Sequence, residues 1–243
     1  MQRYFAKEKK DNLFLLEEKD YHHIKNVMRM EENDLVEVVH DNILYLACIQ
    51  NVKENIKITL EKMIKNEEEN SKKIVLFIPF LKEQKLDFIL QKSTELGVFK
   101  ICLIPLERSI IKAKENKTDK KIERWRRILK EASEQSKRLS VPEIEIISDI
   151  KLLSDLKGLN LICSTKNNLK NIKKVMKNNS SFDIINVVIG PEGGLTLKEE
   201  EILESFGFIP ITLGNRIMRA ETVPLYLMSV FNYEFMEWFL CLF

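Results

Sequence analysis

From residue 73 onward, runs rich in β-branched apolar residues alternate with stretches whose apolar residues recur at helical spacing, and the connections are short. This alternation favours a mainly parallel sheet with helices on both faces, an α/β fold. It predicts strands over 73–79, 100–105, 144–147, 159–164, 183–189 and 208–213, and helices over 83–96, 120–138, 169–177, 197–206 and 222–235. Ligands of such sheets bind beyond the carboxyl ends of the strands, so we expect the site there.

The first part of the chain has a different pattern, because short apolar runs alternate with polar ones. It predicts a small β-rich domain with strands over 12–16, 35–40, 43–50 and 56–60. Between the first two, Ile24, Val27 and Met28 recur at helical spacing, so we expect one helix over 21–30 that crosses the barrel or sheet. The polar stretch 66–73 is the expected linker, which places a domain boundary near residue 70.

Composition excludes several classes of protein. The 243 residues are 44% hydrophobic and 31% charged, as in an ordinary globular protein. The apolar stretches 74–81 and 238–243 are far shorter than the roughly 20 residues that cross a bilayer, and residues 1–10 lead into no apolar core. The four cysteines (48, 102, 163 and 241) are far apart, and nothing gathers metal ligands. We expect a cytoplasmic protein with reduced thiols, no membrane span and no metal site.

The charge is unevenly distributed along the chain. Residues 1–70 hold 11 Lys and Arg against 15 Asp and Glu, whereas residues 71–243 hold 28 against 22. Within 108–138 the balance is 12 against 5. Such a segment is typical of a surface that faces phosphates, although a solvated helix face would look the same.

Glycine is rare and concentrated. Five of the seven glycines fall within residues 190–214. The first loop there, IGPEGG (189–194), follows a predicted strand and precedes a helix whose start is marked by Thr196 and Glu199 as a capping box. The loop is neither GxGxxG nor a phosphate loop. It is either a tight structural turn or a loop whose backbone amides face a ligand.

The second loop, LGNRIMRAET (213–222), interleaves polar and apolar residues. Ile217 and Met218 could enclose a flat heterocycle while Arg219 and Glu221 face a second substrate. The alternative is that an Arg–Glu pair merely fastens the loop.

Both loops carry a resemblance to a known family. The segments IGPEGGLTLKEEEI (189–202) and LGNRIMRAET (213–222) resemble the RsmE family of 16S rRNA uridine-N3 methyltransferases, within the knotted SPOUT class. Further matches are HHIKNVMR (22–29), QKSTELGV (91–98), ERSI (107–110) and EASEQSKR (131–138). The chain departs from the family at Asn33 and Lys137, where a glycine is usual, and at Val223-Pro224, which replaces small residues.

The resemblance implies a PUA-like RNA-binding β-barrel domain over 1–70 and a SPOUT methyltransferase domain over 71–243 with a C-terminal deep trefoil knot. It also implies a homodimer, S-adenosylmethionine as cofactor, and 16S rRNA or the small ribosomal subunit as partner. The positions that match the family's cofactor loops are Cys163, Ser164, Ile189, Gly190, Glu192, Gly193, Leu213, Gly214, Ile217, Met218 and Arg219.

Residue chemistry suggests roles within that site. Methylation of uridine N3 develops negative charge between two carbonyls, so Arg219 is the candidate stabilising cation and Glu221 its orienting group or the proton acceptor. His22 and His23 are expected to make packing contacts. The residues expected to track RNA are Arg3, Arg29, Lys85, Lys92, Arg108, Arg124, Arg126, Arg127 and Arg138. Two alternatives remain open: a ribose 2′-O methyltransferase of the same class, or a non-catalytic RNA-binding protein.

Overall fold

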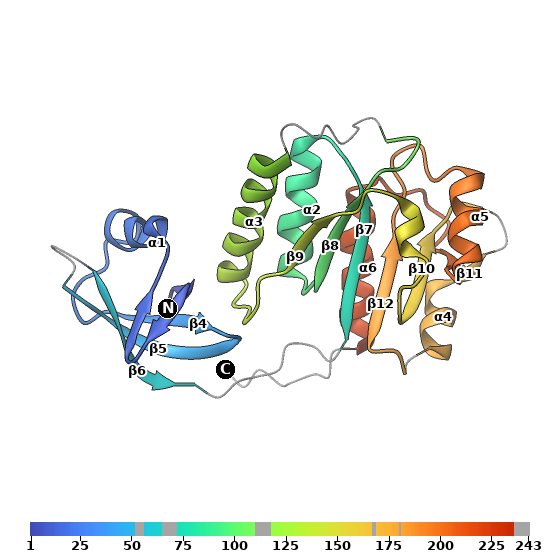
Figure 1. Ribbon diagram of the computed structural model, residues 1–243. Helices are drawn as coiled ribbons and strands as arrows, with labels where there is room; N and C mark the ends of the chain where they lie inside the picture. Colours follow the sequence, from blue (N-terminus) through green and yellow to red (C-terminus); the bar gives the residue numbers. More distant parts are fainter. Residues whose placement is uncertain (52–55, 65–71, 110–117, 167–168, 180, 236–243) are drawn as a thin grey trace. The chain divides into compact units, whose positions relative to one another are not determined.

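The computed structural model describes residues 1–51, 56–64, 72–109, 118–166, 169–179 and 181–235. The chain forms two compact units. The first comprises Met1–Glu69 together with Lys130–Val141, and the second comprises Asn70–Leu129 together with Pro142–Phe243. Figure 1 shows the elements of each unit. No helix of the described residues is both long enough and apolar enough to span a membrane.

The first unit is built on a six-stranded sheet in the order β1-β4-β5-β6-β3-β2. Neighbouring strands are antiparallel except for β1, which is parallel to β4. Between β1 and β2, the Ala6 N–H bonds to Val39 O and the Lys7 N–H to Leu15 O, so one bent segment joins both edges and closes a barrel. The strands are β1 (Arg3–Phe5), β2 (Glu8–Lys10), β3 (Leu13–Leu15), β4 (Leu35–His40), β5 (Ile43–Gln50) and β6 (Lys57–Met63).

The expected helix over 21–30 is a short α-helix, α1 (Glu18–His22), continued by a π-helical turn over His23–Val27. Ile24 is buried, whereas Val27 and Met28, which recur with it at helical spacing, are 58% and 44% exposed. A π turn holds more residues than an α turn, which shifts the following side chains away from the helical face assumed from their spacing. His23 contacts Tyr4, whose hydroxyl lies 3.0 Å from Nδ1.

The segment Lys130–Val141 enters the first unit through a buried charge cluster. The Lys130 ammonium lies 2.7 Å from Asp20 Oδ2, 3.1 Å from Glu17 Oε2 and 3.6 Å from Glu134 Oε1. Buried charges are tolerated where they are paired, and one cation here serves three carboxylates. Burial raises the pKa of Glu134 to about 7, with Lys130 opposing and Asp20 reinforcing the shift.

A second polar cluster joins the same segment to β4. Arg3 is 5% exposed, and its Nε donates to Glu37 at 2.9 Å while Nη1 donates to the carbonyls of Lys137 and Arg138. The Lys137 ammonium also lies 2.9 Å from Glu37. Burial alone would raise the pKa of Glu37, but the hydrogen bonds and charges of Lys137 and Arg3 lower it below its usual value.

The second unit is built on a seven-stranded sheet in the order β11-β13-β10-β12-β7-β8-β9, with every neighbouring pair parallel. Its strands are β7 (Lys73–Pro79), β8 (Lys100–Ile104), β9 (Glu143–Ile146), β10 (Leu159–Cys163), β11 (Lys170–Asn171), β12 (Ile184–Val188) and β13 (Ile209–Thr212). Its helices are α2 (Glu83–Glu95), the first part of α3 (Thr118–Gln135), a 3-10 helix (Ile150–Leu153), α4 (Ile172–Asn178), α5 (Leu197–Ser205) and α6 (Thr222–Phe235).

Both faces of this sheet are covered. On one face, alternate residues of the central strands pack with α5 and the 3-10 helix in a single buried cluster. Val75 and Phe77 of β7 belong to that cluster, whereas Ile74, Leu76 and Ile78 point to the opposite face and are buried as well. The expected mainly parallel α/β fold is therefore confirmed, and α2 packs against α6.

The predicted strands and helices occur within a few residues of their expected bounds. The prediction omitted β1, β2 and β11, which are two or three residues long, and the 3-10 helix. Most of the expected linker over 66–73 and Cys241 lie outside the described residues, although Lys73 already belongs to β7. Cys48 and Cys102 are buried free thiols, and Cys163 is a half-buried one.

Replacing Gly158, which precedes β10, should strongly destabilise the protein. Gly158 has a φ of +108°, and a Cβ there would lie 3.0 Å from the carbonyl carbon of Ile184 and closer still to its oxygen. Strain and a backbone clash together predict a loss of about 3 kcal/mol in Gly158→Ala. Gly207→Ala is the matched control, because Gly207 has a φ of +84° with open space around it, so about 1 kcal/mol is expected. Urea unfolding measures both, and equal losses would contradict the clash.

The raised pKa of Glu134 predicts a pH-dependent stability. Because the folded state holds the proton up to about pH 7 and the unfolded state only to about pH 4.5, stability falls as pH rises through this window. Glu134→Gln stays neutral, so its stability relative to the unchanged protein should be up to about 3 kcal/mol higher at pH 8 than at pH 4. Glu123→Gln, exposed on the same helix, is the control. Parallel pH profiles of Glu134→Gln and the unchanged protein in urea unfolding would refute this assignment.

Candidate active site

Three loops lie side by side at the carboxyl-terminal ends of the strands of the parallel sheet. In the sheet β10 lies between β12 and β13, with Ile162 beside Val188 and Cys163 beside Ile211. The carboxyl ends of these strands therefore lead into Cys163–Ser164, the glycine loop (189–194) and the arginine loop (213–221). All eleven residues expected to hold a cofactor lie at these three neighbouring strand ends.

The glycine loop is a compact turn held by its own backbone. The Gly194 N–H donates to Pro191 O at 2.8 Å. A Cβ at Gly190 would lie 3.0 Å from Leu195 N, so the chain approaches itself too closely for a side chain there. The predicted capping box is confirmed, because Thr196 Oγ1 accepts from the Glu199 N–H and the Glu199 carboxylate accepts from the Thr196 N–H.

A neighbouring loop fastens this turn from outside. Arg108, which follows β8, donates from Nη1 to Gly193 O at 2.7 Å and to Leu195 O at 3.3 Å. Its stem crosses Gly193, where a Cβ would lie 3.3 Å from Arg108 Cδ. The Glu107 N–H donates to Glu199 Oε1 at 2.7 Å. Sequence reasoning assigned Arg108 to RNA alone and missed this contact, since nothing in the local motif indicates its partner.

The arginine loop carries both exposed and shielded side chains. Ile217 is 90% exposed, Met218 is half-buried, and Arg219 is exposed. Its last residues lead into α6, where the Thr222 N–H donates to Arg219 O at 2.9 Å. An exposed apolar side chain beside an exposed guanidinium suits a surface that binds a ring and an anion together.

Lys85 of α2 connects the two loops. Its ammonium pairs with the Glu192 carboxylate of the glycine loop and lies 3.2 Å from Glu221 Oε2 of the arginine loop. The alternative of an Arg219–Glu221 pair that fastens the loop is not among the ion pairs of the described residues, although the charge of Arg219 also lowers the pKa of Glu221. The pKa of Glu221 is below its usual value, because its own backbone N–H donates to the carboxylate and Lys85 lies beside it.

The wall after β10 is uncharged. Burial raises the pKa of the Cys163 thiol to about 12, so the thiol keeps its proton at neutral pH. Ser164 is 8% exposed, and its N–H donates to Ile211 O at 3.1 Å, which extends the pairing of β10 with β13 beyond the strand end. A protonated thiol is a poor nucleophile, so Cys163 suits packing against a ligand.

Comparison with known proteins identifies the family. Residues 67–232 match the model of an RNA methyltransferase domain, and residues 16–62 match that of an RNA methyltransferase PUA domain. The ribosomal RNA small subunit methyltransferase E of Bacillus subtilis (strain 168) is 32% identical over 248 residues, covering 96% of this chain and 97% of the relative. The chain belongs to the RsmE family of rRNA methyltransferases. It is therefore an enzyme, and the expected PUA domain is confirmed.

Other members of the family agree in length and fold. The enzyme of the same description from Mesomycoplasma hyopneumoniae (strain 232) is 32% identical, covering 94% of this chain and 98% of that protein. The structure of ribosomal RNA small subunit methyltransferase E from Neisseria gonorrhoeae, bound to S-adenosyl methionine, matches with a TM-score of 0.85 at 28% identity. The match covers 96% of this chain and 97% of the Neisseria gonorrhoeae chain. A putative methyltransferase from Legionella pneumophila, in complex with the same cofactor, matches with a TM-score of 0.87 at 27% identity and the same coverage.

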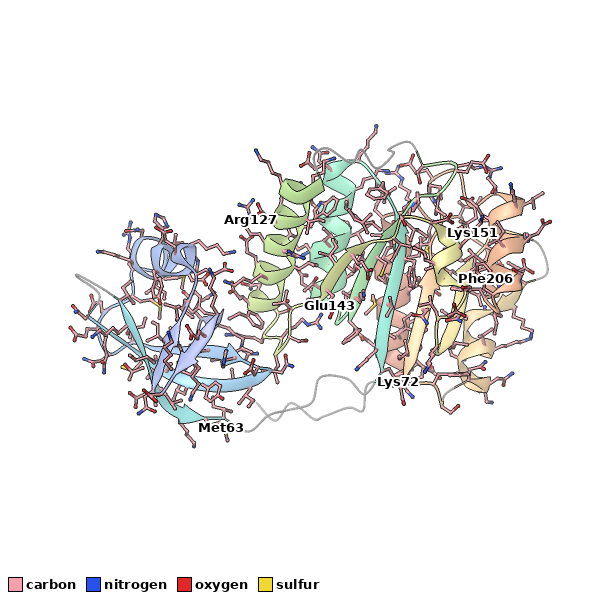
Figure 2. The ribbon with its side chains drawn as sticks, viewed as in Figure 1. Met63, Lys72, Arg127, Glu143, Lys151 and Phe206 are labelled. Carbon is pink, nitrogen blue, oxygen red and sulfur yellow. The ribbon has the colours of Figure 1, made fainter. Side chains whose placement is uncertain are left out.

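The residues expected to track RNA occupy different environments. Arg3 and Arg138 are buried in the first unit. In the second unit Lys92 lies 2.8 Å from Glu95, and Arg124 pairs with Glu83 and Asp87 of α2. The exposed members of the set are Arg29, Arg108, Arg126 and Arg127, of which Figure 2 labels Arg127 on α3. No cluster of three or more potential metal ligands occurs in the part of the chain that the structure describes.

Shortening Arg108 should weaken cofactor binding without unfolding the protein. Arg108→Met keeps most of the aliphatic stem over Gly193 but loses both hydrogen bonds to the glycine loop. A loss of about 1 kcal/mol corresponds to a roughly fivefold rise in the Kd for S-adenosylmethionine, measured by calorimetry without RNA. Arg126→Met, an exposed arginine on α3, should leave this Kd unchanged. An unchanged Kd in Arg108→Met would show that the loop does not depend on Arg108.

Proposed function

We propose that this chain transfers the methyl group of S-adenosylmethionine to N3 of one uridine in the 16S rRNA of the small ribosomal subunit. The convergence of three loops at neighbouring carboxyl ends of a parallel sheet carries the proposal. One support is the family of this chain, whose relatives are named ribosomal RNA small subunit methyltransferases. A second is that two solved structures similar to this chain contain the cofactor.

The chemistry of the three loops fits the cofactor. Exposed Ile217 and half-buried Met218 offer apolar surface to a flat heterocycle, and the backbone of the glycine loop offers polar groups to its edge. The neutral Cys163 thiol places no charge in that wall. The residues that would hold the cofactor are Cys163, Ser164, Ile189, Gly190, Glu192, Gly193, Leu213, Gly214, Ile217, Met218 and Arg219.

Catalysis should consist mainly of positioning and charge stabilisation. When bound, S-adenosylmethionine supplies a methyl group on a sulfonium, which an in-line nucleophile takes without covalent help from the protein. Uridine N3 loses its proton in the reaction, and the exposed guanidinium of Arg219 would stabilise the resulting negative charge. Glu221 is a weak proton acceptor because its pKa is lowered. We therefore assign Glu221 a positioning role and propose that water accepts the proton of N3.

The target uridine must be unpaired or turned out of its helix, because base pairing covers N3. We propose that exposed arginines of both units bind the flanking phosphates, with Arg29 in the first unit and Arg126 and Arg127 in the second. The proposal includes an RNA-binding domain over 1–70, a knotted methyltransferase domain over 71–243, a homodimer and a cytoplasmic location.

The position of the transferred methyl tests the proposal. Purified protein is incubated with labelled S-adenosylmethionine and small ribosomal subunits that lack uridine methylation, and the methyl is located by nuclease digestion and mass spectrometry. The expected product is a single N3-methyluridine in 16S rRNA. A ribose methyl would replace the proposal with a 2′-O methyltransferase, and cofactor-independent RNA binding alone would replace it with a non-catalytic protein.

Removing the Arg219 guanidinium should slow transfer far more than it weakens RNA binding. Arg219→Ala loses the group that would face the developing negative charge, so kcat should fall about 100-fold. Arg216→Ala, an exposed arginine of the same loop outside the proposed site, should keep a kcat within about twofold of the unchanged enzyme. Steady-state transfer to small subunits measures kcat of both variants, and near-normal kcat in Arg219→Ala would exclude Arg219 from catalysis.

A further inference from the structure

Lys85 is the one residue of the expected RNA-tracking set that pairs with two carboxylates from the two site loops. It lies in the first turn of α2, and its side chain is 29% exposed. Its partners Glu192 and Glu221 belong to loops that follow different strands and are far apart in sequence. One ammonium therefore connects the glycine loop, the arginine loop and α2.

This arrangement is unfavourable for phosphate binding by Lys85. A phosphate would have to compete with two carboxylates that already neutralise the ammonium, one of which is only 16% exposed. The neighbouring Lys82, one turn earlier and exposed, has no such partners among the described residues. Of the two lysines, Lys82 is the one available to a nucleic acid backbone.

Lys85 is also dispensable for holding α2 in place. Leu86, Ile89 and Leu90 are each at most 2% exposed and anchor the helix in the core. On another side of the helix, Arg124 pairs with Glu83 and Asp87. The contribution of Lys85 is thus local to the two loops. Removing its charge leaves Glu192 and Glu221 without the cation they share, with only Arg219 still acting on Glu221.

We propose that Lys85 is a positioning residue of methyl transfer, which acts by pairing with Glu192 and Glu221 at the same time and so holds the glycine loop and the arginine loop at the spacing the reaction needs. The expected effect on kcat rests on the proposed function. The expected effect on the Kd for S-adenosylmethionine does not depend on the RNA substrate. Arg219 lies two residues before Glu221 in the same loop, so a displacement of Glu221 would also move the backbone that carries Arg219.

The pairing of Lys85 with two carboxylates predicts changes in activity that the loss of a merely structural lysine would not cause. Lys85→Met keeps the aliphatic length but removes the charge, and should raise the Kd for S-adenosylmethionine about fivefold and lower kcat about 20-fold. Lys85→Arg should recover at least half of the lost kcat on a logarithmic scale. Glu192 is also a proposed cofactor-binding residue, so the effect of Lys85→Met is compared in two backgrounds. Because Glu192→Gln removes the repulsion between the carboxylates, Lys85→Met should lower kcat about fivefold less in the Glu192→Gln background than in the unchanged enzyme. Lys82→Met is the matched control for the Kd.

Calorimetry gives the Kd without RNA, and steady-state transfer to undermethylated small subunits gives kcat and the KM for RNA. A higher KM for RNA in Lys85→Met, with kcat and cofactor Kd unchanged, would overturn the proposal in favour of phosphate binding. An equal fall of kcat on Lys85→Met in the Glu192→Gln background and in the unchanged enzyme would overturn the role of the pairing. If the unchanged enzyme fails to methylate small subunits, the proposed function fails, while an unchanged cofactor Kd in Lys85→Met would separately refute the positioning role.

Discussion

The site of this protein depends on the position of β10 between β12 and β13. Because the three strands are parallel neighbours, their carboxyl ends lie at the same end of the sheet. The loops that follow them are therefore adjacent, although they are distant in sequence. The pairing continues past β10 through Ser164 N–H and Ile211 O. Gly158, at the start of β10, allows the close approach of β12 on which this order depends.

Strand order brings the loops together but does not determine their conformation. That is done by side chains of the loop after β8, of α2 and of α5. Arg108 binds carbonyls of the glycine loop, Glu199 binds the backbone beside Arg108, and Lys85 pairs with one carboxylate of each loop. Three charged groups thus hold flexible backbone in place, which keeps the polar surface of the loops ordered before any ligand arrives.

The sequence predicted what depends on local pattern. Strand and helix periodicity and the capping box at Thr196 were visible in it, and the family resemblance indicated the loops. Contacts between distant residues were not visible: Arg108 and Lys85 both looked like phosphate ligands, because an isolated cation does not reveal its partner. The π turn over His23–Val27 was likewise not visible, because hydrophobic spacing does not distinguish a π turn from an α turn.

The grouping of Lys130–Val141 with the first unit bears on how the protein can be divided. The chain crosses between the units three times, and the barrel obtains the counter-ion of Asp20 from a residue more than a hundred positions away. At Lys137, where the family usually has glycine, the backbone has a φ of 62° and its side chain pairs with Glu37. The barrel is therefore not complete without the segment Lys130–Val141. A fusion protein or a domain exchange that transfers the barrel should include this segment.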